Sequence, residues 1–125
     1  MKTEIKTEQA PQAIGPYAQA IEANGFLFVS GQLPIDPVTG EFADGGIKEK
    51  TEQSIRNIEA ILKKAGSSLE NVVKTTVFLN DIADFGEMNE VYKEWFKGVC
   101  PARSAVEVAN LPKQSLIEIE VIAVK

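Results

Sequence analysis

Two stretches of the chain repeat apolar residues at the spacing of a helix that buries one side. The first runs over residues 47–65 and is followed by Gly66, a residue suited to the left-handed turn that ends many helices. The second begins after Asp81 or Asp84, either of which can cap a helix N-terminus. The pattern predicts two helices, each with one buried face. Their apolar stripes are Ile47, Ile55, Ile58, Ile61, Leu62 and Ala65 in the first, and Phe85, Met88, Val91, Tyr92, Trp95 and Phe96 in the second.

The remaining apolar segments are short and have the residue usage of strands. Asn24-Gly25 separates the first two, and this dipeptide favours a tight hairpin turn. The segment over residues 72–79 is β-branched and apolar on both faces, which is typical of a central strand. The order hairpin, helix, strand, helix, strand, strand predicts an α+β fold, a β-sheet with two helices packed on one face. The predicted strands are residues 17–23, 26–30, 72–79, 102–109 and 116–124.

Composition excludes several classes of function and says less about the fold. The 125 residues are 44% hydrophobic and 25% charged, which fits a single domain over residues 1–125. The net charge of −5 gives no attraction for phosphate backbones or anionic lipid, and no apolar run is long enough to cross a bilayer. We therefore expect neither nucleic acid nor membrane as a partner. The chain has no histidine, which excludes a Ser-His-Asp triad and any histidine-ligated metal.

The cysteine content and the start of the chain indicate a cytoplasmic protein. Cys100 is the only cysteine, so no internal disulfide is possible. The first residues, MKTEIKTEQ, lack the apolar run of a secretory signal.

The last two predicted strands carry charged residues among apolar ones. We expect an apolar row, residues 117, 119, 121 and 123, to face the helices together with Ser104, Val106 and Val108. This assignment leaves Arg103, Ala105 and Glu118 on the opposite face. Because that face also carries Ile122 and Val124, we expect it to meet another copy of the chain.

The position of Arg103 allows two interpretations. If the last two strands pair antiparallel about a turn near Pro112, Arg103 lies opposite Ile122 and more than about 10 Å from Glu118. A close meeting of Arg103 and Glu118 would then require two subunits. From the pattern alone, Arg103 either pairs with a neighbouring glutamate or grips a small carboxylate in the hollow that small alanine side chains leave.

Six motifs, in order along the chain, resemble those of the RidA, or YjgF, family of reactive intermediate deaminases. The resemblance covers nearly the whole chain and implies a chorismate-mutase-like α+β protomer that forms a homotrimer, with three sites between subunits. It also implies hydrolysis of 2-enamine and 2-imine acids to 2-keto acids and ammonia, without a cofactor. Such intermediates are released by pyridoxal-phosphate-dependent dehydratases, and examples are 2-aminoacrylate, 2-iminopropanoate and 2-iminobutanoate. The motifs are IGPYAQA (14–20), VSGQLP (29–34), TGE (39–41), VVKTTVFLNDIADFGEMNEVY (72–92), PARSAVEVANLPK (101–113) and IEIEVIAV (117–124).

The resemblance assigns catalytic roles to three residues. Arg103 would clamp the substrate carboxylate, since a permanent cation on a rigid strand fixes the geometry of a small anion. Glu118 would hold and polarise the attacking water and move protons as the intermediate collapses. Tyr17 would offer its hydroxyl while its ring closes the pocket. Glu120 is the alternative to Glu118, but Glu118 is the first glutamate of IEIE, the position that the family uses.

Four further residues are predicted to line the substrate site. Ser30 and Gly31 would present a backbone N–H at a strand end. Asn89 would donate to the substrate from the second helix, and Ala105 would leave space beside Arg103. Many relatives carry cysteine where this chain has Ala105, and Cys100 does not inherit that role. Any thiol-dependent property of the family is therefore in doubt here.

Two other functions stay open at this point. A trimer with the same pocket could bind 2-keto acids as a sensor without turnover, or shield unfolded proteins. Some relatives are described as endoribonucleases or translation inhibitors. The net charge and the lack of interleaved basic and aromatic residues argue against RNA as the substrate.

Overall fold

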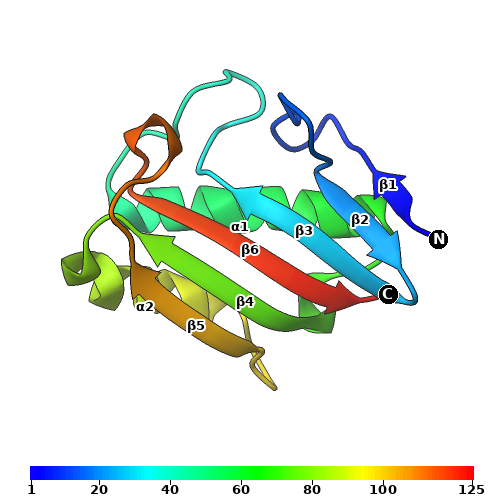
Figure 1. Cartoon of the computed structure of the whole chain (residues 1–125). Coiled ribbons are helices and arrows are strands. Elements are labelled where there is room, and N and C mark those ends of the chain that lie inside the picture. Colours follow the sequence, from blue (N-terminus) through cyan, green and yellow to red (C-terminus); the bar gives the residue numbers. More distant parts are fainter.

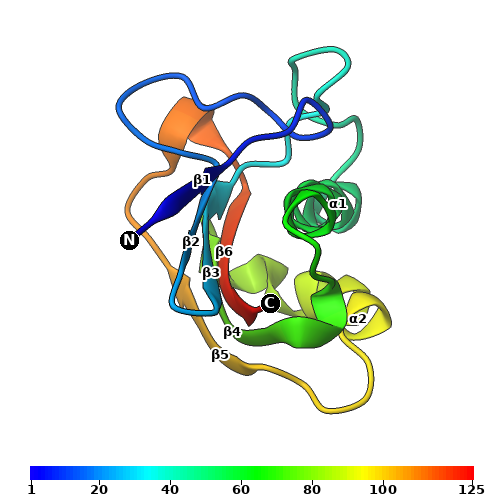
Figure 2. The same cartoon turned by 90° about the vertical axis from the view of Figure 1, so that its right-hand side faces the viewer.

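The computed structural model, which describes all of residues 1–125, is a six-stranded sheet with both helices on one side. Figure 1 views the sheet from its open face with α1 and α2 behind it, and Figure 2 shows the two layers edge-on. The predicted α+β class is confirmed. The strand order is β1-β2-β3-β6-β4-β5, and only the β4–β5 pair is parallel. The elements are β1 (Thr3–Ile5), β2 (Ala20–Ala23), β3 (Phe26–Gln32), α1 (Ile47–Lys64), η1 (Leu69–Asn71), β4 (Val72–Leu79), η2 (Ile82–Asp84), α2 (Phe85–Trp95), β5 (Ala102–Glu107), η3 (Pro112–Gln114) and β6 (Ile117–Val124).

The hairpin between β2 and β3 is confirmed. Asn24 and Gly25 have φ angles of 53° and 81°, and a two-residue turn of this kind requires positive φ at both positions. β2 begins at Ala20, three residues later than predicted, and β3 continues to Gln32. The pairing of β3 with β6 is irregular between Val29 and Gln32. β1 was not predicted, because it has only three residues and lies in a polar segment at the sheet edge.

Both predicted helices are present. The predicted stripe of α1 is buried, and that of α2 is buried except for Phe85 and Trp95, which are partly buried against the core. After α1, Gly66 has a φ of 81° and the Ser67 N–H donates to the Leu62 carbonyl at 2.8 Å, which completes the expected left-handed cap. Before α2, the Asp81 carboxylate accepts from the Ala83 N–H at 2.9 Å, so Asp81 caps the short turn η2 that leads into the helix. No helix is both long enough and apolar enough to cross a membrane.

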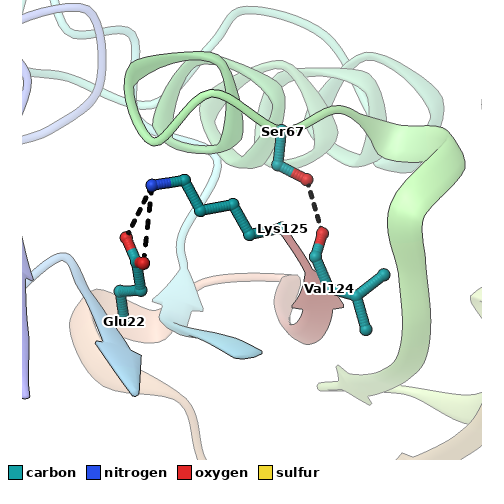
Figure 3. Close-up of polar contacts among 4 residues, drawn as sticks. All are labelled: Glu22, Ser67, Val124 and Lys125. Carbon is teal, nitrogen blue, oxygen red and sulfur yellow. Dashed lines mark hydrogen bonds and ion pairs between the residues drawn. The ribbon is translucent and has the colours of Figure 1, made fainter. Parts of the chain in front are cut away.

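Side-chain contacts link the C-terminal end of β6 to the segment after α1 and to β2 (Figure 3). The Ser67 hydroxyl, just after α1, donates to the Val124 carbonyl at 2.8 Å. The Lys125 Nζ lies 3.3 Å from a carboxylate oxygen of Glu22 on β2. The last strand of the chain is therefore anchored at its final residue.

The last two strands do not pair with each other, which corrects the predicted antiparallel alignment. β4 lies between them: Arg103 on β5 pairs with Thr75 on β4, and Thr75 pairs with Val121 on β6. The segment between β5 and β6 crosses β4 instead of forming a hairpin. The prediction was wrong because alternation specifies the face of a residue and not which strand lies next to it. β5 also ends at Glu107, two residues earlier than expected.

The core lies between the sheet and the helices, and the opposite face of the sheet is uncovered. The apolar row of β6 is buried as predicted, in a cluster of 21 residues. On the opposite face Phe26, Phe28 and Val106 are 40%, 46% and 43% exposed. The β6 residues Glu118 and Ile122 alternate with the buried row and lie on this open face.

Candidate active site

Arg103 lies on the helix side of the sheet, which corrects its predicted face. Its guanidinium carbon Cζ lies 4.7 Å from the centre of the Tyr92 ring and 5.4 Å from that of the Phe85 ring. Both rings belong to α2. The Arg103 cation is therefore held against aromatic faces, a contact that is attractive and restricts its orientation.

The neighbouring strand β4 explains this reversal. Thr75 and Val77 of β4 are fully buried beneath the helices, and they pair with Arg103 and Ala105 of β5. Paired residues in neighbouring strands point to the same side of the sheet. The prediction placed Val106 inward because it is more apolar than its neighbours, but Val106 lies on the open face and Ala105 packs against the core.

Most of the Arg103 donors have no partner within the chain. One guanidinium N–H donates to the Oδ1 of Asn89 on α2 at 2.7 Å. A guanidinium carries five N–H donors. None of the ion pairs in the chain involves Arg103, which contradicts the predicted alternative of a pair with a neighbouring glutamate. Arg103 is thus a cation held in one orientation, with N–H donors that have no partner. Asn89 orients Arg103 through its carbonyl oxygen, and the NH₂ group of Asn89 stays unpaired.

Glu118 lies in a pocket on the other face of the sheet. This pocket has a volume of about 730 Å³, and Tyr17, Ser30 and Gly31 also line it. Burial raises the pKa of Glu118 above its usual value, and the negative charge of Glu120 raises it further. Glu120 is exposed and does not line the pocket. Of these two carboxyls, only Glu118 lies in the pocket.

Gly31 makes room for the Glu118 side chain. A Cβ atom built on Gly31 would lie 2.7 Å from the Glu118 carboxyl carbon Cδ, which is closer than side chains approach in folded proteins. The backbone of Gly31 does not have positive φ, so a larger residue here would conflict with the Glu118 side chain, which would have to move, and not with the backbone conformation. The VSGQLP and IEIEVIAV motifs therefore meet at this pocket.

Ser30 is a structural wall of the pocket more than a donor to a ligand. Its hydroxyl donates to the Ala18 carbonyl at 2.6 Å, and its backbone N–H donates to the Gln19 carbonyl at 2.9 Å. The Ser30 N–H, expected to point at a substrate, is therefore already used. These two bonds hold the segment that carries Tyr17, whose side chain is 54% exposed at the pocket.

Sequence reasoning missed two buried amides that shape the pocket. The Gln19 side chain donates to the Pro11 carbonyl at 2.8 Å and accepts from the Thr7 N–H at 2.7 Å. The Asn57 side chain, from α1, donates to the carbonyls of Leu33 and Ile35 at 3.2 and 2.9 Å. No local pattern marks either amide, because their partners are backbone carbonyls elsewhere in the chain.

The predicted site residues form two groups on opposite faces of the sheet. Arg103, Asn89 and Ala105 lie on the helix side, and Tyr17, Ser30, Gly31 and Glu118 surround the pocket on the open side. Through the observed pairing, Arg103 and Glu118 are two strands and three residues apart, or roughly 14 Å between backbone positions. The predicted separation within one chain holds, although the pairing behind it was wrong.

Comparison with known protein families assigns the chain to one of them. Residues 7–125 match the family described as Endoribonuclease L-PSP, which comprises the RidA and YjgF proteins. The chain belongs to the RidA/YjgF family. The resemblance inferred from the six motifs is confirmed.

Individual RidA/YjgF relatives match over almost their full length. A RutC family protein of Pyrococcus horikoshii is 59% identical over 125 residues, 100% of this chain and 99% of that protein. The 2-iminobutanoate/2-iminopropanoate deaminase of Mus musculus is 50% identical over 121 residues, 97% of this chain and 90% of the deaminase. The crystal structure of E. coli TdcF with bound serine is 43% identical, with a TM-score of 0.94 over 98% of each chain. The RidA/YjgF fold is thus shared, while the names of relatives differ in the activity they state.

Proposed function

We propose that this RidA/YjgF protein is a homotrimer that hydrolyses 2-imino and 2-enamino acids to 2-keto acids and ammonia. The observation that carries the proposal is the division of complementary groups between two faces of one chain. A fixed guanidinium with unused donors lies on edge strand β5, and a carboxyl of raised pKa lies in a pocket on the open face. A second copy packed against the open face would bring its own Arg103 to the Glu118 pocket of the first. The exposed apolar residues of that face favour such packing.

Two comparisons support this substrate class. The mouse relative is named a deaminase of 2-iminobutanoate and 2-iminopropanoate. The E. coli relative has bound serine, a small molecule with a carboxylate and an amino group on the same carbon. An imino acid carries its carboxylate and nitrogen in the same relation.

The proposed mechanism uses three groups. Arg103 binds the substrate carboxylate through two parallel N–H donors and so fixes the position of C2. Glu118 accepts a proton from a water molecule while the water oxygen forms a bond to C2, giving a tetrahedral carbinolamine. Glu118 returns this proton to the nitrogen, which becomes an amino group. Glu118 then takes the proton of the new hydroxyl group and passes it to the same nitrogen, so that the C2–N bond breaks, ammonia leaves and the keto group forms. Tyr17 donates its hydroxyl to the water or to the substrate.

The enamine tautomer enters the same sequence after one proton shift. 2-Aminoacrylate gains a proton at C3 and loses one from nitrogen, which converts it to 2-iminopropanoate. One imine and one water then yield one keto acid and one ammonia, so the reaction balances without an oxidant or reductant. The mechanism as proposed uses no cofactor.

A subunit-mixing experiment tests both the reaction and the position of the site. 2-Iminobutanoate is generated in the assay, and release of 2-oxobutanoate above the uncatalysed rate is measured for wild type, Arg103→Ala and Glu118→Gln. We expect each variant alone to be nearly inactive. Equal amounts of the two variants, unfolded and refolded together, should recover about a quarter of the wild-type activity, because random mixing restores Arg103 and Glu118 at that share of the interfaces.

Three results would contradict the proposal in different ways. If wild type does not raise the release of 2-oxobutanoate above the uncatalysed rate, the protein is not an imine deaminase. Binding of 2-keto acid without turnover would instead support a sensor. Inactive separate variants with no recovery on mixing would place the site within one chain. A mixture of wild type with Arg56→Ala, refolded in the same way, controls for losses during refolding.

Gly31→Ala should inactivate the protein through Glu118. The added methyl group would occupy the space of the Glu118 carboxyl, so we expect a fall in kcat close to that of Glu118→Gln. The double variant Gly31→Ala/Glu118→Gln should then be no slower than Glu118→Gln alone. Gly46→Ala is the matched control, because a Cβ at Gly46 meets no atom within 4 Å. Additive losses in the double variant would show that Gly31 acts independently of Glu118.

A further inference from the structure

A buried hydrogen bond lies directly behind the Arg103 guanidinium, and the proposed mechanism does not use it. The Tyr92 hydroxyl on α2 and the Thr75 hydroxyl on β4 lie 2.7 Å apart. Tyr92 is 5% exposed and Thr75 is fully buried, so their own chain encloses both side chains. The bond therefore does not depend on a second copy packed against the open face of the sheet.

Tyr92 contacts the β4–β5 pair at two points. Thr75 is the β4 residue that pairs with Arg103 on β5, so the two side chains lie side by side beneath α2. The Tyr92 hydroxyl bonds to Thr75, and the centre of the Tyr92 ring lies 4.7 Å from the Arg103 Cζ. The Phe96 ring packs against the same tyrosine, with 4.5 Å between ring centres. A ring held in this way gives the guanidinium a fixed surface.

The residues of α2 that contact Arg103 lie on one face of the helix. Phe85, Asn89 and Tyr92 follow one another at intervals of four and three residues, which places them on successive turns of the same side. The Phe85 ring and the Asn89 carbonyl oxygen contact the guanidinium directly. Of these three side chains, only Tyr92 also forms a hydrogen bond to β4. Tyr92 therefore fixes this face of α2 relative to the strand beside Arg103.

The two hydroxyls depend on each other because both are buried. Burial raises the pKa of Tyr92, and the Thr75 bond and the charge of Arg103 oppose this effect only in part, so the Tyr92 hydroxyl keeps its proton at neutral pH. Removing one partner leaves the other hydroxyl buried without a hydrogen bond, which is costly. Replacing both partners by apolar groups of the same shape costs little. A single and a double substitution at this pair should therefore have opposite consequences.

We propose that Tyr92 and Thr75 are positioning residues for Arg103. Their hydrogen bond fixes the Tyr92 ring, and the ring holds the guanidinium in the orientation that binds the substrate carboxylate. The effect on catalysis rests on the proposed function, in which Arg103 is the carboxylate clamp, whereas the effect on the orientation of Arg103 does not. Both residues act through Arg103.

Steady-state kinetics with 2-iminobutanoate test the pair. In Thr75→Val the Tyr92 hydroxyl loses its partner and turns toward water, which displaces the ring, so we expect kcat/KM to fall about three- to tenfold. The double variant Tyr92→Phe/Thr75→Val leaves no buried hydroxyl and should return to within about twofold of wild type. Ile58→Val, buried on α1, controls for lost packing, because the contacts of Arg103 come from α2, and it should also stay within about twofold.

Tyr92→Leu tests the ring itself. Loss of the aromatic face should lower kcat/KM by about 5- to 30-fold, the range expected for a cation over a buried ring. In the Arg103→Ala background the same substitution should cost less than about twofold, because the group that the ring positions is already absent.

An NMR measurement reports on Arg103 without turnover. The Nε–H signal of Arg103, identified by its absence in Arg103→Lys, should be displaced by the ring currents of Tyr92 and Phe85. We expect this displacement to decrease in Thr75→Val and to return in Tyr92→Phe/Thr75→Val. Ile58→Val should leave the signal where it is in wild type.

The outcomes separate positioning from a purely structural role. A lower Tm with wild-type kcat/KM and an unmoved Arg103 signal in Thr75→Val and Tyr92→Leu would overturn the proposal, because the pair would then only stabilise the fold. Equal losses from Tyr92→Leu with and without Arg103 would also overturn it. If wild type hydrolyses no imine, the proposed function fails, and the NMR signal alone decides whether the pair orients Arg103. If Tyr92→Leu does not fold, Thr75→Val and the double variant decide, since both preserve the shape of the core.

Discussion

Replacing Arg103 by alanine is expected to lower kcat/KM for imine hydrolysis by about 100- to 1,000-fold. The substrate is small, and its carboxylate is the one charged group by which it can be oriented. Two charge-assisted hydrogen bonds from a fixed guanidinium are worth about 3 to 4 kcal/mol here, and each 1.4 kcal/mol is a tenfold change in rate. The measurement is the steady-state rate of keto acid release over a range of imine concentrations.

The chain contains a matched control for this substitution. Arg56 also lies over an aromatic ring, with its Cζ 5.8 Å from the centre of the Trp95 ring, but it forms an ion pair with Glu52. Arg56→Ala should leave kcat/KM within about twofold of wild type, because it removes an exposed arginine outside both groups of site residues. Arg103→Lys should recover only part of the activity, since an ammonium lacks the two-pronged donor geometry. Equal rates in wild type and Arg103→Ala would refute the carboxylate clamp.

Replacing Glu118 by glutamine is expected to lower kcat by about 100- to 10,000-fold, with a small effect on KM. This is the usual contribution of a positioned general acid–base group, and glutamine cannot move a proton. Because Glu118 must be ionised to take a proton from water, wild-type kcat/KM should fall as the pH drops through the pKa of Glu118, which lies above 4.5. Glu118→Gln should lack this acid limb.

Glu120→Gln is the control that separates the electrostatic effect of a nearby carboxylate from proton transfer by Glu118. Glu120 raises the pKa of Glu118 by repulsion, so its removal should move the acid limb to lower pH while kcat at neutral pH is retained. A loss of kcat in Glu120→Gln as large as that in Glu118→Gln would show that the two carboxyls have been assigned in the wrong order.

The same raised pKa predicts how Glu118→Gln affects stability. The folded protein holds the Glu118 proton more tightly than the unfolded chain, so the wild-type free energy of unfolding decreases as the pH rises through this pKa. Glu118→Gln cannot ionise and escapes this loss. We therefore expect Glu118→Gln to have a higher Tm than wild type at pH 7, and the difference to shrink below pH 4.5. A lower Tm at both pH values would contradict the cause given for the pKa.

The features that the sequence predicted correctly depend on neighbouring residues. The stripes of the two helices repeat every three or four residues, and the turn at Asn24-Gly25 needs only its own backbone preference. Gly66 likewise ends α1 by its own conformation. Such signals do not depend on how distant parts of the chain pack. For this reason the predicted bounds of these elements are correct to within a few residues.

The features that were predicted wrongly depend on distant parts of the chain. Residues 108–116 cross over β4, and this crossing makes β4, not β6, the neighbour of β5. No residue in 108–116 predicts the crossing. The face of Arg103 follows from Thr75, its partner on β4. The sequence motifs predicted Arg103 and Glu118 as site residues, but only the strand order revealed that they occupy opposite faces of one chain.

The place of β6 in the sheet has a consequence for synthesis on the ribosome. β6 follows the other five strands along the chain, yet it lies inside the sheet, where β3 and β4 each bond to it and not to one another. While residues 117–124 are still inside the exit tunnel, the emerged chain consists of two separate pieces with open edges. The two halves of the sheet can therefore join only after residues 117–124 have left the tunnel, and their open edges stay unpaired until then.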